Sequence, residues 1–124
     1  MMTWTVLGSA TLPAVPLSVA AARRFAAGLV PRDDTLILLV SEVTTNSVTH
    51  SDSRHGGEFT LTLYDVGGTI RTEVVDAGGA TVPSRREAGE LATTGRGMVL
   101  IEDLAARSGF FVDDAGRLHT WFEL

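Results

Sequence analysis

The sequence predicts an α+β fold, a two-layer α/β sandwich with helices on one face of a mixed, mainly antiparallel sheet. Three observations lead to it. Segments that alternate apolar and polar residues come in pairs joined by short turns, and segments with helical periodicity stand apart from them. The chain has 124 residues, of which 44% are hydrophobic, enough for one buried core. We therefore expect a single domain over residues 1–124.

The first elements are a strand and a helix. Polar and apolar residues alternate over residues 3–7, which predicts a strand that ends at Gly8. An alanine-rich stretch over residues 19–27 predicts a helix, with Ser18 as its N-cap. Gly28 should end this helix, since glycine tolerates the reversed backbone found after a helix terminus.

A second helix and a hairpin follow. Apolar residues recur at helical spacing over residues 34–50, which predicts a helix. Residues 58–65 and 70–75 each alternate in character and are separated by a short glycine-containing turn, so they should pair as a hairpin. Residues 77–94 show little periodicity and predict a long loop, a feature that is usually functional or mobile.

The chain closes with a helix and a second hairpin. Residues 98–107 carry apolar side chains on one helical face. Residues 110–112 and 118–124 flank a turn rich in aspartate and glycine, which predicts two paired strands. The expected element order is therefore β, α, α, β, β, α, β, β.

Composition excludes several classes of function. The net charge of −5 opposes the approach of a phosphate backbone, so nucleic acid is not an expected partner. Without cysteine the chain has no disulfide, no thiolate nucleophile and no cysteine-ligated zinc. No basic stretch followed by an apolar run opens the sequence, and we expect a cytoplasmic protein without a membrane segment.

The second predicted helix carries polar residues where apolar ones are expected. At 100° per residue, Asn46 and His50 project within about 20° of Leu39, on the stripe that should face the core, and Glu42 lies at its edge. Burying such groups without partners costs several kcal/mol, so they need hydrogen bonds, a metal or a wet ligand cavity. Two explanations for these polar residues are open at this point: hydrogen bonds to nearby loop backbone, and a ligand site.

Two glycine-containing motifs are weak when each is taken alone. Asp76 ends a predicted strand and is followed by a glycine at Gly78, where the backbone can approach a flat ligand, although such a motif is often only a turn. Gly95, Arg96 and Gly97 open a predicted helix, whose free N–H groups favour phosphate. The P-loop and dinucleotide patterns are absent, so a nucleotide site must be of another type.

Together these pieces resemble a known ATPase superfamily. Residues 42–50, 75–79 and 94–98 are similar, in order and spacing, to the N, G1 and G2 boxes of the histidine kinase-like ATPase domain of the gyrase, Hsp90, histidine-kinase and MutL superfamily. Within it, the short chain, the Ser-Glu opening of the N box, the histidine that closes it and residues 121–124 resemble the bacterial anti-sigma-factor serine kinases. The resemblance covers residues 4–124.

The resemblance implies a Bergerat-type fold that binds ATP between the second helix and a lid. It implies that Asn46 coordinates Mg²⁺ through its amide oxygen, a ligand that suits a hard cation. It also implies that Glu42 is the general base that takes the proton of an attacking serine. His50 would bond phosphate or shape the pocket. Asp76 would accept a bond from the adenine amine, and Gly78 would let the ring pack closely.

The lid carries further candidates by the same resemblance. Gly95 and Gly97, with Arg96, would approach the phosphates as the lid closes. Arg85 and Arg86 lie in the predicted lid, either reaching the γ-phosphate or standing as solvated charges, which is the commoner state of such residues.

The sequence departs from the family at two places. Ala80 stands where the G1 box often has a further glycine. A threonine on the last strand, two residues before the aromatic residue, commonly helps hold the adenine amine through water; here that spacing falls on His119, and Thr120 lies one position off. A shift of one residue turns a side chain to the other face of a strand, which puts the adenine contact of Thr120 in question.

The resemblance implies an ATP-dependent serine/threonine kinase that binds a sigma factor and phosphorylates an anti-sigma antagonist. The alternative is a non-catalytic module that uses the same fold to bind a regulatory protein, with or without nucleotide. A detached catalytic domain of a sensor histidine kinase fits less well, because no helix carries a phosphoacceptor histidine, and a gyrase or chaperone ATPase needs large further domains. Whether the chain forms a homodimer is left open.

Overall fold

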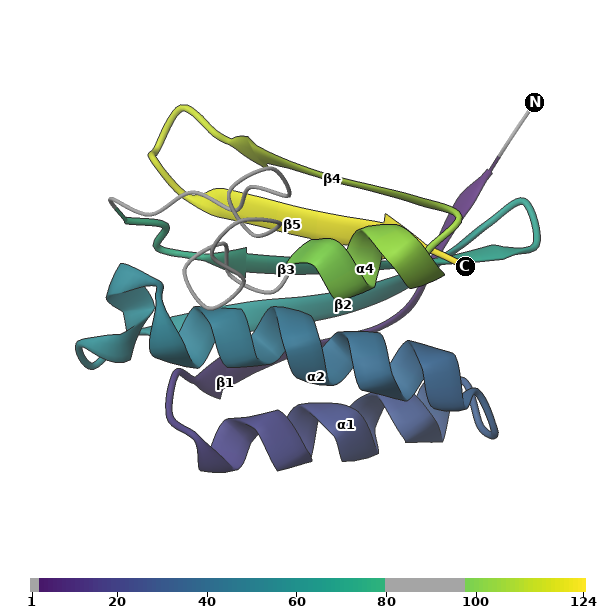
Figure 1. The fold of residues 1–124 in the computed structure, drawn as a ribbon, viewed down its shortest axis with the longest axis horizontal. Helices are drawn as coiled ribbons and strands as arrows, with labels where there is room; N and C mark the ends of the chain where they lie inside the picture. The colour runs from purple at the N-terminus through teal and green to yellow at the C-terminus, as the bar shows by residue number, and fades with distance from the viewer. Residues whose placement is uncertain (1–2, 80–97) are drawn as a thin grey trace.

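The computed structural model describes residues 3–79 and 98–124, which form one five-stranded sheet covered by helices (Figure 1). The elements in chain order are β1 (Trp4–Pro13), α1 (Leu17–Leu29), α2 (Asp34–Thr49), the 3₁₀ helix η1 (Asp52–Arg54), β2 (Glu58–Val66), β3 (Thr69–Asp76), α4 (Met98–Leu104), β4 (Arg107–Val112) and β5 (Leu118–Glu123).

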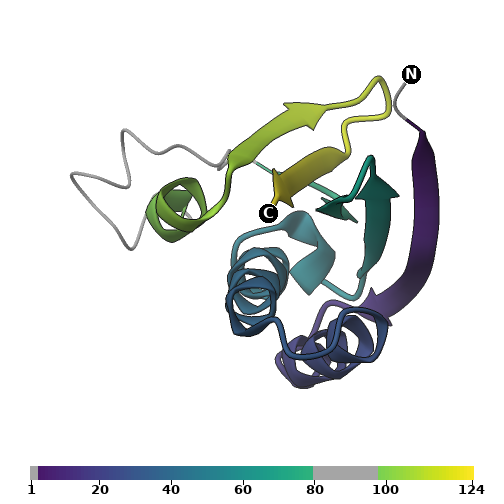
Figure 2. The same cartoon turned by 90° about the vertical axis from the view of Figure 1, so that its right-hand side faces the viewer.

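The sheet has the strand order β1-β2-β3-β5-β4, and each neighbouring pair is antiparallel. Both predicted hairpins are present, as β2–β3 and β4–β5. The helices lie on the inner side of the curved sheet, with α2 between α1 and α4 (Figures 1 and 2). The predicted α+β sandwich is thus confirmed, and among the described strands its sheet contains no parallel pair.

The core lies between α2 and the inner face of the sheet. Apolar residues of α2 recur at helical spacing and meet the alternate residues of β2, β3 and β5 that point inward. The fully buried large side chains are Leu36, Leu39, Val40, Val43, Phe59, Leu61, Leu63, Val74, Ile101, Leu118 and Phe122. This packing fixes α2 against the middle of the sheet, and the polar residues on α2 are fixed with it.

The first strand does not end at Gly8, as its sequence suggested. It continues to Pro13, and its register with β2 shifts between Val6 and Gly8, which marks a β-bulge. A Cβ at Gly8 would lie 2.8 Å from the Cδ1 atom of Leu29, so the glycine lets α1 pack closely on the strand. The glycine therefore marks a bulge within the strand. In the sequence, a glycine at a bulge looks the same as a glycine that ends a strand.

The predicted capping of α1 is also wrong. The helix begins at Leu17, Pro16 occupies the N-cap position, and Ser18 lies inside the first turn with its side chain buried. Proline is favoured near a helix start because its fixed φ suits the helix and its missing N–H would have no partner there. The helix ends at Leu29, one residue beyond the glycine expected to end it.

The last helix is shorter, and the strand after it longer, than predicted. α4 ends at Leu104, and β4 begins at Arg107. The backbone N–H of Ala106 donates to the carbonyl oxygen of Glu123 at 2.8 Å, so pairing with β5 has already begun where the helical periodicity still continues. Tertiary pairing here overrides the local helical pattern.

Candidate functional site

The polar row on α2 takes the orientation that its periodicity predicts. Asn46 is buried, with 7% of its surface exposed, while Glu42 and His50 are half-buried on the turns before and after it. Burial raises the pKa of the Glu42 carboxyl above its ordinary value. The helix ends at Thr49, and the backbone N–H of His50 caps it by donating to the Asn46 carbonyl at 2.8 Å.

Asp76 ends β3 inside the protein and is bonded directly to α2. The Ser47 hydroxyl donates to Asp76 Oδ2 at 2.6 Å, and the backbone N–H of Gly78 donates to Oδ1 at 2.7 Å. Because Ser47 follows Asn46 on the helix, this bond brings the Asn46 turn to the end of β3. The structure therefore brings two of the three predicted motifs together.

Ser47 was not predicted as a site residue, although the sequence holds a signal for it. It lies seven and four residues after Val40 and Val43, in the middle of the apolar stripe of α2. A buried hydroxyl in such a stripe requires a hydrogen-bond partner, just as the amide of Asn46 does.

The turn after α2 supports the loop after Asp76. This contact between the two segments was also not predicted. The backbone N–H of Asp52, in η1, donates to the Gly78 carbonyl at 2.6 Å, and the Ala77 N–H donates to Ser53 Oγ at 2.8 Å. Two segments distant in sequence thus hold each other through backbone and hydroxyl groups. Serine and aspartate favour such local bonds, which is the signal that could have indicated a structured turn here.

Gly78 has no room for a side chain. Its φ is +72°, a left-handed conformation, and a Cβ there would lie 3.1 Å from the carbonyl oxygen of Gly116 in the β4–β5 turn. The glycine thus satisfies two requirements at once, the backbone conformation and the close approach of the β4–β5 turn.

We expect Gly78→Ala to lower the free energy of unfolding by about 1–3 kcal/mol, because the left-handed backbone alone costs about 1–2 kcal/mol per non-glycine residue. Gly28→Ala is the matched control. Gly28 lies within α1, and a Cβ there would meet nothing within 4 Å, so alanine should stabilise the protein by about 0.5–1 kcal/mol. Urea unfolding followed by circular dichroism measures both, and equal effects of the two changes would contradict this account.

Thr120 lies on the same face of the sheet as Asp76. It pairs with Val74, two residues from Asp76, and all three side chains are buried beneath the helices. His119 points to the opposite face, where its Nδ1 lies 3.2 Å from Glu73 Oε1. The one-residue departure from the family spacing therefore does not turn Thr120 away from the Asp76 side.

The remaining candidates lie outside the described residues. They are Ala80, Arg85, Arg86, Gly95, Arg96 and Gly97. The third predicted motif, at the start of α4, is thus described only from Met98 onward.

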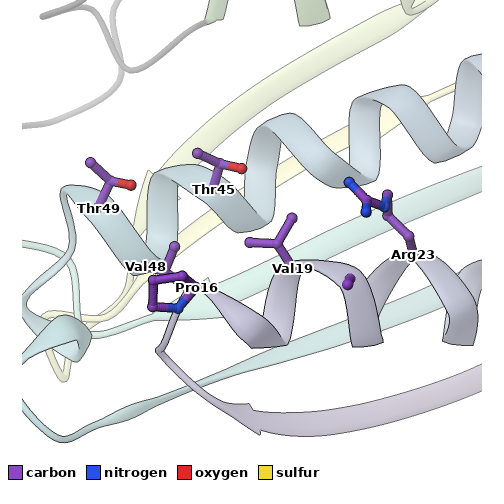
Figure 3. A pocket seen from close by; sticks show the side chains of 7 residues that line it. Pro16, Val19, Arg23, Thr45, Val48 and Thr49 are labelled. Atoms are coloured by element: carbon purple, nitrogen blue, oxygen red, sulfur yellow. The ribbon is translucent and has the colours of Figure 1, made fainter.

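A surface hollow of about 380 Å³ lies elsewhere, between α1 and α2 (Figure 3). Its lining residues are Pro16, Val19, Ala20, Arg23, Thr45, Val48 and Thr49. None of them belongs to the predicted site. Three of them, Thr45, Val48 and Thr49, belong to the same helix as Asn46.

Comparison with known families decides the type of domain. The sequence model of the histidine kinase-like ATPase domain matches residues 9–117, most of the chain. The chain belongs to this family. Both motifs that the structure brings together, on α2 and at the end of β3, lie within the match. No curated protein matches the chain.

Membership in the histidine kinase-like ATPase family implies that ATP is the ligand. No helix in residues 3–79 or 98–124 of this ATPase domain is long and apolar enough to cross a membrane.

Proposed function

We propose that this histidine kinase-like ATPase domain is a cytoplasmic serine/threonine kinase that sequesters a sigma factor and phosphorylates an anti-sigma antagonist. One observation carries the proposal. Glu42 and Asn46 lie in one row on α2, His50 follows as its C-cap, and Ser47 bonds that helix to Asp76. The proposal assigns the base and the metal ligand to this helix and the adenine acceptor to the end of β3.

The residues present fit Mg²⁺ and ATP. Mg²⁺ is usually held through one or two protein oxygens together with phosphate oxygens and water, and the buried amide of Asn46 offers such an oxygen. When bound, the metal neutralises charge on the β- and γ-phosphates. Asp76 would accept the adenine amine at the other end of the nucleotide, with Thr120 on the same face of the sheet.

The proposed reaction transfers a phosphoryl group to a hydroxyl. A serine oxygen of the antagonist forms a bond to the γ-phosphorus, the bond from that phosphorus to the bridging oxygen breaks, and ADP leaves. Glu42 takes the serine proton. Because burial raises its pKa, the Glu42 carboxylate is a stronger base than an exposed glutamate.

We expect Glu42→Gln to lower phosphotransfer by about 10²–10⁴-fold, the usual contribution of a general base, and to keep Mg-ATP binding. Wild-type activity should rise with pH as Glu42 loses its proton, at a pH above the ordinary carboxyl value of 4.5, because the pKa is raised. The residual activity of the variant should lack this rise. The substrate for the assay is the antagonist captured from the native host on the immobilised chain, with radiolabelled ATP.

Three outcomes would decide against parts of the proposal. Wild-type phosphotransfer in Glu42→Gln would remove Glu42 as the base. An unchanged pH profile in the variant would assign the rise to another group. Absence of heat in calorimetry at millimolar Mg-ATP would leave the alternative, a non-catalytic protein-binding module.

A further inference from the structure

The β4–β5 turn packs against the loop that follows Asp76. Asp76 pairs with Leu118, the first residue of β5, so the end of β3 and this turn lie at the same end of the sheet (Figure 1). A Cβ at Gly78 would lie 3.1 Å from the carbonyl oxygen of Gly116, which belongs to the turn. So close a contact couples the position of the turn to the backbone of Gly78. The Gly78 N–H in turn donates to Asp76 Oδ1 at 2.7 Å, so the turn also bears on that carboxylate.

One carboxylate, that of Asp113, organises the β4–β5 turn. Its Oδ1 accepts the backbone N–H of Ala115 at 2.9 Å and that of Arg117 at 3.0 Å. Its Oδ2 lies 2.9 Å from Arg117 Nε and 2.9 Å from His119 Nε2. The bond to His119, followed by that to the Arg117 N–H, holds the pKa of the Asp113 carboxyl well below its ordinary value. Asp113 is therefore ionised at neutral pH and accepts bonds from three residues of the turn and of β5.

The backbone of the turn is held by the same residue. The Asp113 N–H donates to the Arg117 carbonyl at 2.9 Å, and the Gly116 N–H donates to the Asp113 carbonyl at 2.9 Å. Gly116 has a φ of +82°, in the left-handed region. An aspartate that accepts N–H groups two and four residues ahead stabilises a turn of this kind. The Asp113 carboxylate thus helps to fix where the Gly116 carbonyl stands against Gly78.

We infer that Asp113 is a positioning residue for the nucleotide. It fixes the β4–β5 turn, the turn fixes the backbone at Gly78, and this backbone orients the Asp76 carboxylate toward adenine. Asp113 bonds His119, whose side chain lies on the face of the sheet opposite to Asp76, so it acts through the turn and does not touch the nucleotide. The inference rests on the assignment of Asp76 to adenine in the proposed function, and on no part of the kinase reaction.

A matched pair of alanine substitutions tests the inference. Asp113→Ala and Asp114→Ala each remove one acid from the same turn and change the net charge by the same amount. Asp114 is exposed and takes part in no hydrogen bond or ion pair within residues 3–79 and 98–124. Calorimetry in Mg²⁺ compares ATP with inosine triphosphate (ITP). ITP has a carbonyl oxygen in place of the adenine amine, so it cannot donate to Asp76 and serves as an internal control.

We expect Asp113→Ala to bind ATP about tenfold more weakly than the wild type and ITP no more weakly, because a hydrogen bond to a charged group is weakened but not lost. Asp114→Ala should bind both as the wild type does. Asp113→Asn should recover most of the ATP affinity, since an amide oxygen still accepts the N–H groups of Ala115 and Arg117. A loss of folded protein alone would lower the binding of ATP and ITP equally, which would contradict the inference.

Gly116→Ala disturbs the turn while Asp113 stays in place. A Cβ at Gly116 would meet nothing within 4 Å, so alanine acts only by straining the left-handed backbone, and it should also reduce the preference for ATP over ITP. If Asp113→Ala and Gly116→Ala both keep the wild-type preference, the inference is wrong and the assignment of Asp76 to adenine stands. A wild type that binds ATP and ITP equally would overturn that assignment, and the inference with it.

Discussion

Replacing Asn46 with alanine is expected to lower the Mg²⁺-dependent affinity for ATP by about 100-fold or more, since even a residue that only supports a metal ligand contributes about 10–100-fold to metal affinity. Asn46 is buried on α2 at the turn that Ser47 bonds to the end of β3, so water cannot easily replace its amide oxygen in the same position. Isothermal titration calorimetry measures the effect, with ATP titrated in Mg²⁺ and again in EDTA.

The two titrations separate a metal role from a structural one. Alanine should weaken binding strongly in Mg²⁺ and only slightly in EDTA, because the amide acts through the metal. Thr45→Ala is the control, an exposed neighbour on the same helix that should bind as the wild type does. Equal losses in Mg²⁺ and EDTA would show that Asn46 supports the pocket without holding the metal.

The helix that carries this site could be predicted from sequence because its two signals reinforce each other. Leu36, Leu39, Val40 and Val43 set the period of α2, and the same period identifies Asn46 as a polar residue on the buried face. The hairpins were predictable for a similar reason, since alternation and a glycine turn coincide in each.

The connections within the site were not predictable in the same way. Nothing in the sequence joins Ser47 to Asp76, 29 residues later, or the Asp52 N–H to the Gly78 carbonyl, because these bonds exist only once α2 lies on the sheet. The face of Thr120 could also not be predicted from the family spacing. Counting from an aromatic residue gives a position relative to other family members, whereas the face depends on this chain's own pairing of Thr120 with Val74.

The hydrogen bonds that stabilise the end of β3 are the same bonds that hold Asp76, the proposed contact for adenine. Asp76 is both the proposed acceptor for adenine and the acceptor for two buried donors of the protein, Ser47 and Gly78. A change at Asp76 therefore affects folding and nucleotide choice together, and a test must separate the two. Ser47→Ala offers that separation, since it removes one of the structural bonds and keeps the carboxylate.

We expect Asp76→Ala to lower the free energy of unfolding by about 2–5 kcal/mol, because each buried donor left without an acceptor costs about 1–3 kcal/mol. Ser47→Ala should cost only about 1 kcal/mol, the usual net contribution of one hydrogen bond. Urea unfolding measures both. If the two variants were equally stable, Asp76 would not be the common acceptor that joins α2 to the loop after β3.

The preference for ATP over GTP is a measurement that a loss of folding stability alone would not change. The Asp76 carboxylate accepts the adenine amine but repels the carbonyl oxygen that guanine presents at that position, so the wild type and Ser47→Ala should both prefer ATP to GTP strongly. Asp76→Asn keeps the shape of the side chain and adds a donor, which should bind the guanine carbonyl and reduce the preference at least about tenfold. Calorimetry below the unfolding temperature of each variant measures this ratio. An Asp76→Asn protein that is folded and still discriminates as the wild type does would place the adenine acceptor on another residue.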